Sequence, residues 1–268
     1  MDKILETKRK EVRMLHESFE LAELKTAAAE APRARNFFSA VTARGKGPVN
    51  VIAEVKKASP SAGVIRQDFD PVSIARQYRA GGASAISVLT DEQYFQGSLD
   101  HLRHIRRAVD LPILRKDFII DQMQVYQSRA AGADAILLIA AALPPSDLLD
   151  LMILATELRM TSLVEVHDAD ELLAVRSAVG FPHAGYGLLG INNRSLATFE
   201  VDINTTIRLA DLVGEDVHIV SESGISTYQD VMRLAKAGVE AVLVGEALIR
   251  RDDIAEGISL LLGHSRSG

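Results

Sequence analysis

The sequence has no cysteine among its 268 residues. That absence excludes a disulfide framework, a thiolate nucleophile and a metal site built on thiolates. The chemistry of the protein must therefore come from Lys, Glu, Asp, Asn, Ser or His side chains.

Long apolar runs are also missing. The longest, Ala135–Leu143, is far short of the about 20 residues that a membrane-spanning helix needs. The first residues, Met1–Glu6, carry charges and lack the apolar stretch of a secretory leader. We therefore expect a soluble cytoplasmic protein with no membrane partner.

Basic residues form no dense block, and the formal net charge is −6. A nucleic acid partner requires basic side chains gathered against its phosphates, so the composition argues against DNA or RNA. An anionic small molecule must instead be held by a local cluster of donors.

Short β-branched or aliphatic runs alternate with segments of helical period along most of the chain. The predicted strands are Val49–Val55, Ala85–Leu89, Pro112–Arg115, Ala135–Ile139, Ser162–Val166, Tyr186–Ile191, Val217–Ser221 and Glu240–Val244. The predicted helices are Pro71–Gly81, Leu99–Val109, Met123–Gly132, Leu148–Arg159, Ala169–Val179, Thr205–Val213 and Tyr228–Gly238. Eight such units in series have the size of a (β/α)8 TIM barrel, an α/β fold. An open doubly wound sheet is the weaker alternative, because no Gly-x-Gly-x-x-Gly follows the first strand.

We predict a single domain over residues 1–268, with the barrel at 49–268 and a helical N-terminal extension at 1–48. Gly81, Gly132 and Gly238 are predicted to end helices in the left-handed conformation, since an apolar strand follows each of them. In the extension, Asn36 is placed to cap a helix that carries Phe37. The extension either closes the barrel bottom or covers the catalytic mouth, and the sequence leaves both open.

Polar residues gather at the carboxyl ends of the predicted strands, which form the catalytic face of a TIM barrel. Because side chains alternate along a strand, Glu54 and Lys56 project to the same side. The same parity joins Asn192 to Arg194. Other strands end in Lys116-Asp117, Glu165 and Glu222, whereas the strand Ala135–Ile139 ends without a polar group. We expect a pocket with one apolar wall and opposed charges elsewhere.

Glycine and serine follow the last two predicted strands, as Ser223-Gly224 and Gly245-Glu246. Loops at these positions of TIM barrels commonly bind phosphate through backbone N–H groups. Ser59 lies near Lys56 and adds a donor from the opposite side. Taken alone, a serine-glycine pair is typical of a turn, and a charged pair is typical of a structural ion pair. The functional interpretation depends on the placement of all these residues on one rim. The histidines His101, His104 and His167 are predicted to be loop or surface residues.

Several motifs together resemble the indole-3-glycerol phosphate synthases, in order and spacing over almost the whole chain. They are Glu54–Gly63, Leu89–Asp91, Tyr94–Ser98, Leu114–Ile119, Glu165–His167, Gly190–Arg194 and Ser221–Ile225. Two positions depart from the family pattern: Ser195 replaces an Asp of many relatives, and Glu246 replaces a Ser of some. Glu246 can therefore offer phosphate only its backbone N–H.

The resemblance implies the substrate 1-(2-carboxyphenylamino)-1-deoxyribulose 5-phosphate, which would be closed, decarboxylated and dehydrated in tryptophan biosynthesis without a metal or organic cofactor. Catalytic roles are implied for Glu54, Lys56, Lys116, Glu165, Asn192 and Glu222. Substrate and phosphate binding is implied for Ser59, Arg194, Ser223, Gly224, Gly245 and Glu246. Association with other enzymes of the pathway is left open.

Three other functions compete with this one. A Schiff-base aldolase on a phosphate-binding barrel would use Lys116 or Lys56 as its nucleophile. A phosphoribosylanthranilate isomerase has a similar fold but relies on a catalytic Cys, which this sequence lacks. A non-catalytic phosphate-ligand binder would not need so many acid and base groups on one rim.

Overall fold

The computed structural model describes residues 1–45, 47–179, 187–195, 198–214 and 216–264. Within these residues, eight parallel strands close into a barrel in the order β1-β10-β9-β8-β7-β6-β5-β4. The strands are β1 (Asn50–Val55), β4 (Ala85–Leu89), β5 (Ile113–Lys116), β6 (Ala135–Ile139), β7 (Thr161–Val166), β8 (Gly187–Asn192), β9 (Ile219–Glu222) and β10 (Ala241–Val244). Because β1 pairs with both β10 and β4, the sheet has no free edge, and the predicted barrel is confirmed over the open sheet.

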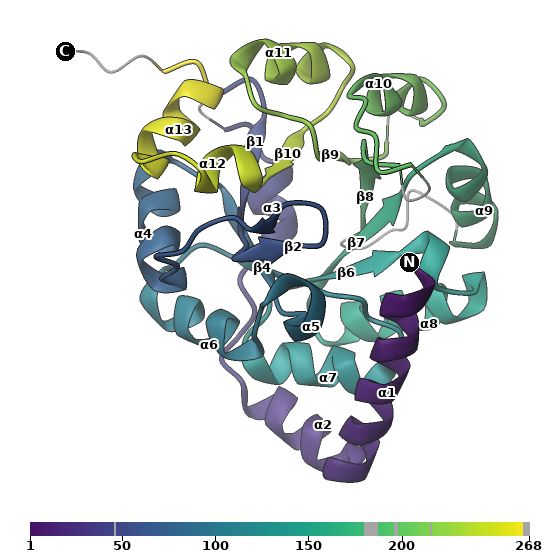
Figure 1. Cartoon of the computed structure of the whole chain (residues 1–268). Helices are drawn as coiled ribbons and strands as arrows, with labels where there is room; N and C mark the ends of the chain where they lie inside the picture. The colour runs from purple at the N-terminus through teal and green to yellow at the C-terminus, as the bar shows by residue number, and fades with distance from the viewer. Residues whose placement is uncertain (46, 180–186, 196–197, 215, 265–268) are drawn as a thin grey trace.

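Helices surround the barrel strands in Figure 1, as the alternating sequence pattern predicts. They are α4 (Pro71–Gly81), α6 (Leu99–Ala108), α7 (Gln122–Ala131), α8 (Pro145–Glu157), α9 (Ala169–Val179), α10 (Asn204–Ala210), α11 (Tyr228–Lys236) and α13 (Ile254–Leu261). Short elements within the connections are β2 (Ala58–Ser59), β3 (Gly63–Val64), α5 (Glu92–Phe95), the 3-10 turn η1 (Ala140–Ala142) and α12 (Glu246–Ile249). Of the helices described, none combines the length and hydropathy that crossing a bilayer requires. Tyr186, predicted to begin a strand, lies outside the described residues.

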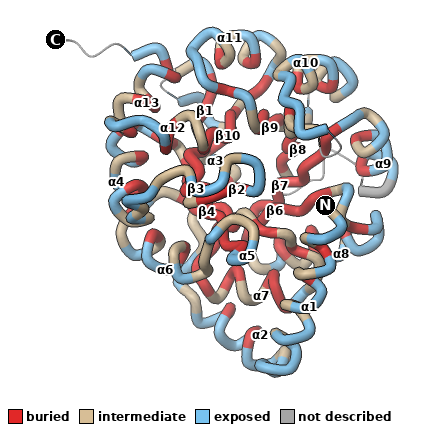
Figure 2. The backbone as a smooth tube through the Cα atoms, in the orientation of Figure 1, coloured by how far each residue is buried: buried red, intermediate tan, exposed pale blue. Residues whose placement is uncertain are grey.

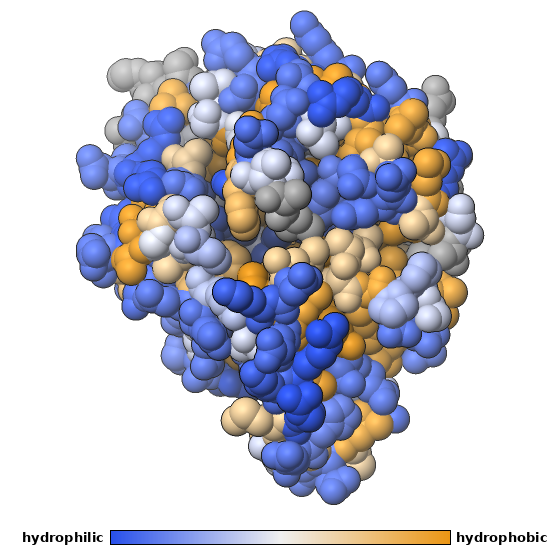
Figure 3. Space-filling view, turned by 45° about the vertical axis from the view of Figure 1, so that its right-hand side comes forward, coloured by the Kyte–Doolittle hydropathy of each residue, from blue (hydrophilic) through white to orange (hydrophobic). Residues whose placement is uncertain are grey.

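Two apolar layers lie on either side of the barrel wall, and Figure 2 shows the strands as the most buried part of the chain. The outer layer packs the strands against the surrounding helices. The inner layer fills the barrel and comprises Ile52, Ala85, Leu114, Ala135, Leu137, Ile139, Leu163, Leu188, Val220, Ala241 and Leu243, with Phe37 and Val41. Surface residues are mostly hydrophilic on the face in Figure 3, with hydrophobic residues gathered toward the right of that view.

Gly132 and Gly238 adopt the predicted left-handed conformation, with φ of 96° and 82°. The prediction for Gly81 is wrong, because Gly82 takes that role with φ of 95°. Gly81 is the last residue of α4, and a Cβ there would lie 2.6 Å from the backbone oxygen of Ala255. Close packing of α13 on α4, rather than a turn, accounts for glycine at residue 81.

The N-terminal extension forms α1 (Asp2–Ser18), α2 (Leu21–Glu30) and α3 (Phe37–Thr42), and its parts lie at different ends of the barrel. Asn36 caps α3 by accepting from Ser39 N–H, as predicted. Phe37 and Val41 enter the inner apolar layer near Ala85 and Ala135, which begin their strands, so α3 closes the barrel bottom.

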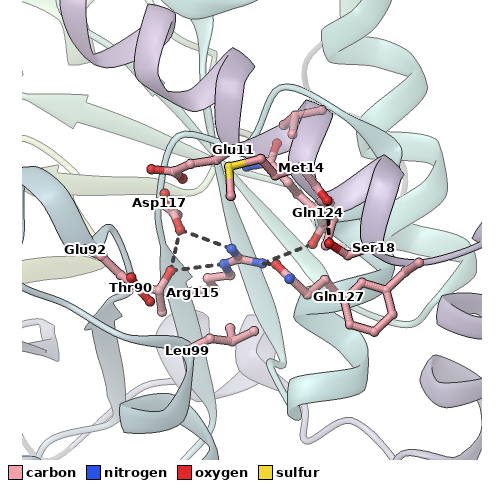
Figure 4. A pocket seen from close by; sticks show the side chains of 13 residues that line it. Glu11, Met14, Ser18, Thr90, Glu92, Leu99, Arg115, Asp117, Gln124 and Gln127 are labelled. Carbon is pink, nitrogen blue, oxygen red and sulfur yellow. Dashed lines mark hydrogen bonds and ion pairs between the residues drawn. The ribbon is translucent and has the colours of Figure 1, made fainter.

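The first helix, α1, lies instead beside the loops that follow β4 and β5. Lys8 Nζ lies 3.1 Å from Asp91 Oδ2 and 2.9 Å from Asp117 Oδ1, and all three side chains are buried. Figure 4 shows the adjoining pocket, where Arg115 contacts Asp117, Thr90 and Gln127 below the helix. The extension therefore reaches both barrel ends: α3 closes the barrel bottom, as one alternative predicted, and α1 lies beside loops at the carboxyl ends of the strands.

Candidate active site

The residues of the inner apolar layer identify the strand positions that face the barrel interior, because side chains alternate along each strand. Ile52, Leu114, Leu163 and Val220 all belong to that layer. Two residues further along each strand, at its carboxyl end, stand four charged side chains on the same face. They are Glu54, Lys116, Glu165 and Glu222.

Lys116 lies at the centre of these charges. Its Nζ is 3.1 Å from Glu165 Oε2 and 3.2 Å from Glu222 Oε2. The three side chains are 14%, 4% and 2% exposed, so the contacts are shielded from water. Residues separated by more than a hundred positions thus meet at one opening, as the strand-end pattern predicts.

A second ion pair joins Glu54 to Lys56, with 2.6 Å between Oε1 and Nζ. This contact confirms that the two side chains share a face. Gly245 makes room for it, because a Cβ at residue 245 would overlap the Glu54 carboxylate. Gly245 has a negative φ of −120°, so the close approach of the Glu54 carboxylate, and not a left-handed turn, accounts for glycine here.

Three carboxylates determine the charge of Lys116. Burial lowers the pKa of its ammonium, but the nearby Glu165, Glu222 and Glu54 outweigh burial and raise that pKa above its ordinary value. Burial conversely raises the pKa of Glu165, and Lys116 with His167 outweighs it and lowers the pKa. Lys116 is therefore protonated and Glu165 ionised at neutral pH.

Glu222 behaves differently. Burial, helped by the like charge of Glu165, outweighs Lys116 and raises the pKa of Glu222 to about 8. Lys116 contacts Glu222 Oε2, whereas Glu222 Oε1 is buried and has no hydrogen-bond partner among the described residues. That oxygen is suited to a hydrogen bond with a bound molecule. Gly190 leaves space beside it, since a Cβ there would lie 2.6 Å from Glu222 Oε1.

His167 lies in the connection between β7 and α9, so it is a loop residue as predicted, but it is not a surface residue. Only 9% of the residue is exposed, and its ring lies between Glu165 and Glu171. The parity that joins Glu54 to Lys56 also joins Glu165 to His167, and the spacing of four to Glu171 is one helical turn. Both signals are present in the sequence, but a histidine considered singly does not reveal them.

Asn192 ends β8 and Arg194 follows it, and both make local contacts. Asn192 Oδ1 accepts a 3.0 Å hydrogen bond from Arg194 N–H, and Asn192 pairs with Glu222 across the sheet. Arg194 Nη1 donates to the carbonyl of Phe199, 3.2 Å away, in its own loop. The side chain of the buried Asn193 forms hydrogen bonds with Ser221, Ser223 and Thr206. The sequence did not indicate these contacts.

The expected phosphate-binding residues lie in loops that leave neighbouring strands. Ser223 and Gly224 follow β9 with φ of 68° and 78°. Gly245 follows β10, the strand that pairs with β9. Glu246 begins α12, and its carboxylate forms an ion pair with Arg250, 2.8 Å away. On the other side, Ser59 lies in the β2-β3 hairpin after β1, and its Oγ accepts from Ala62 N–H.

An apolar wall completes the mouth. Leu137 and Ile139 of β6 face inward, and Phe118 packs against the same layer. Ile139 pairs directly with Glu165 on β7, so the apolar wall adjoins the charged cluster. The arrangement can hold a flat apolar group next to a proton donor and a proton acceptor.

Solved structures with similar folds share little sequence with this chain. A thiamine phosphate pyrophosphorylase from Pyrococcus furiosus matches with a TM-score of 0.57 at 16% identity, covering 81% of this chain and 95% of the other. The tryptophan synthase a2b2 complex of the same organism contributes a chain with a TM-score of 0.57 at 17% identity, covering 82% and 100%. These similarities show the fold alone.

Sequence comparison is more specific. A family model for indole-3-glycerol phosphate synthase matches residues 1–261. The indole-3-glycerol phosphate synthase of Rhodopirellula baltica is 48% identical over 262 residues, covering 98% of each chain. That of Chloroherpeton thalassium is 48% identical over 257 residues, covering 95% of this chain and 96% of the relative. Matches of this length and identity show that the chain belongs to the indole-3-glycerol phosphate synthase family.

Proposed function

We propose that this chain converts 1-(2-carboxyphenylamino)-1-deoxyribulose 5-phosphate into indole-3-glycerol phosphate, carbon dioxide and water. The observation that carries the proposal is the cluster in which Lys116 contacts both Glu165 and Glu222 inside the barrel mouth. The reaction needs an acid, a base and a place for an aromatic ring. The cluster and the adjoining apolar wall supply all three.

Ring closure begins when the aromatic carbon that bears the carboxylate attacks the C2′ carbonyl of the sugar. That carbonyl becomes a good electrophile when its oxygen is protonated, and Lys116 is the proposed general acid. Three carboxylates keep Lys116 protonated, which supports this role. Loss of carbon dioxide then returns the bonding electrons to the ring.

Dehydration requires a second acid and a base. Lys56 is proposed to lie near the substrate carboxylate and to protonate the departing hydroxyl, with Glu54 holding its ammonium at 2.6 Å. Glu165 is the proposed base that removes the last proton and restores aromaticity. Its low pKa means that it is ionised and ready to accept that proton.

Binding residues hold the flexible substrate so that ring and carbonyl meet. Asn192 and Glu222 are proposed to orient the hydroxyls, and Ser59 and Arg194 to hold anionic ends. For the phosphate we propose mainly backbone donors, at Ser223, Gly224, Gly245 and Glu246. Orientation of this kind saves up to about 7–11 kcal/mol of an activation barrier.

The same proposal covers the organisation of the chain. Residues 1–268 form a single domain, with the extension at 1–48 and the barrel at 49–268, and the protein acts in the cytoplasm on a small molecule. The charge of −6 and the absence of a dense basic block support the exclusion of nucleic acid. No metal or organic cofactor takes part in the steps above.

A fluorescence assay for indole-3-glycerol phosphate, started from synthetic substrate, tests the activity. We expect turnover by the wild type, its loss in Glu165→Gln, and a separate block of dehydration in Lys56→Ala. No product from the wild type would refute the proposal. Borohydride treatment with substrate should leave Lys116 and Lys56 unmodified, because a trapped imine would indicate the aldolase.

A further inference from the structure

We propose that His167 is a positioning residue that holds the Glu165 carboxylate through the oxygen that Lys116 does not contact. His167 Nε2 lies 3.2 Å from Glu165 Oε1, while Lys116 Nζ lies 3.1 Å from Glu165 Oε2. The two oxygens of one carboxylate thus have different cations. The inference rests on the proposed role of Glu165 as the base.

The histidine is itself held from its far side. Its Nδ1 lies 3.1 Å from Glu171 Oε2, and its backbone N–H donates to the same oxygen at 2.9 Å. Glu171 is fixed in the first turn of α9, where its N–H donates to Asp168 Oδ1. The ring is therefore clamped between a buried carboxylate of the barrel and a partly exposed carboxylate of a helix.

Two carboxylates at the two ring nitrogens require a doubly protonated ring. A neutral imidazole has one N–H donor, whereas the imidazolium has two, one directed at Glu171 and one facing Glu165 Oε1 across a 3.2 Å ion-pair contact. Burial lowers the pKa of His167, but Glu165 and Glu171 outweigh it and raise that pKa to about 10. His167 accordingly carries a permanent positive charge at neutral pH.

That charge matters most when Lys116 has given up its proton. The titratable groups facing Glu165 are Lys116 from β5, Glu222 from β9, Glu54 from β1 and His167. Once Lys116 is neutral, His167 is the cation among them that still stabilises the Glu165 carboxylate. It keeps Glu165 ionised and pointed into the mouth for the proton removal that follows.

Kinetics of His167→Gln and His167→Ala test the role. We expect kcat to fall roughly 10- to 100-fold, as for a displaced catalytic group, with KM within about threefold of the wild type. We also expect the acid side of the kcat profile to move to higher pH, because Glu165 loses a cation. Glu171→Gln should give a smaller change in the same direction.

The exposed His104 of α6 provides the matched control, and His104→Gln should retain wild-type kinetics. Turnover within twofold of the wild type in His167→Gln would overturn the proposal. So would a loss of activity with an unmoved pH profile and a lowered melting temperature, which indicates a structural role only.

NMR titration of the ligand-free protein separates this inference from the proposed function. The His167 ring should remain an imidazolium through pH 8 in the wild type and lose its proton at lower pH in Glu165→Gln. This result stands even if the wild type turns over no substrate. A ring that is neutral at pH 7, or that Glu165→Gln leaves unchanged, would refute the clamp.

Discussion

Lys116 Nζ lies 3.1 Å from Glu165 Oε2, so the proposed acid and the proposed base form an ion pair before substrate arrives. Each keeps the other in the protonation state that its role requires. Substrate binding must therefore separate the pair or place the reacting atoms beside it. The two groups consequently have to be tested by changes that separate charge from proton transfer.

Replacement of Lys116 tests its role as the acid. Lys116→Met removes both charge and proton, and we expect kcat to fall by about 10²- to 10⁴-fold, the usual worth of a general acid. Lys116→Arg keeps the cation, but a guanidinium does not give up its proton, so it should be similarly inactive. Steady-state turnover within tenfold of the wild type in either variant would exclude Lys116 as the acid.

The pKa of Glu222 predicts how stability depends on pH. Its ordinary value of 4.5 rises to about 8 in the folded chain, so the folded state binds this proton more tightly than the unfolded state. The resulting stabilisation is complete at low pH and is lost as pH rises from about 4.5 to about 8.

Glu222→Gln keeps the shape of the neutral acid and cannot ionise. The free energy of unfolding of the wild type, relative to this variant, should decrease between pH 4.5 and pH 8. Urea denaturation at several pH values measures the difference. A constant or increasing difference would mean that Glu222 is ionised in the folded protein.

The period of apolar residues was sufficient to predict the barrel. For β4 and β6 even the bounds agree, because both are fully buried parallel strands that read as continuous apolar runs. The helix α13 and the β2-β3 hairpin were not predicted. The hairpin strands have two residues each, too short for any period to show.

The charged site was predictable from side-chain parity and strand ends, which placed Glu54, Lys116, Glu165 and Glu222 around one mouth. The sequence could not show which acidic side chain pairs with which basic side chain. The contact of Lys8 with Asp117 joins residues from helix and barrel, and no local pattern encodes a distance across the fold. The space that Gly245 leaves for Glu54 depends in the same way on the closure of β1 against β10.

Gly245→Ala tests whether that space serves the Glu54 carboxylate. An added Cβ would push Glu54 away and disturb its pair with Lys56, so we expect kcat to fall, by up to about 100-fold, with little change in KM. Gly214→Ala is the control, because a Cβ there would meet nothing within 4 Å. An increased KM with normal kcat would mean that the added Cβ disturbs only phosphate binding and leaves the Glu54–Lys56 pair intact.

Lys8→Met tests the attachment of α1 to the catalytic face. Lys8 is 2% exposed and lies between Asp91 and Asp117. Its removal would take away the cation that contacts the buried Asp91 and would leave Asp117 with Arg115 alone. Breaking a buried pair in this way costs about 3–5 kcal/mol of unfolding free energy. Lys10→Met removes an exposed pair with Glu6 on the same helix and should change stability little. Equal midpoints of urea denaturation for the two variants would show that Lys8 contributes no more than a surface ion pair, and that apolar packing alone holds α1 in place.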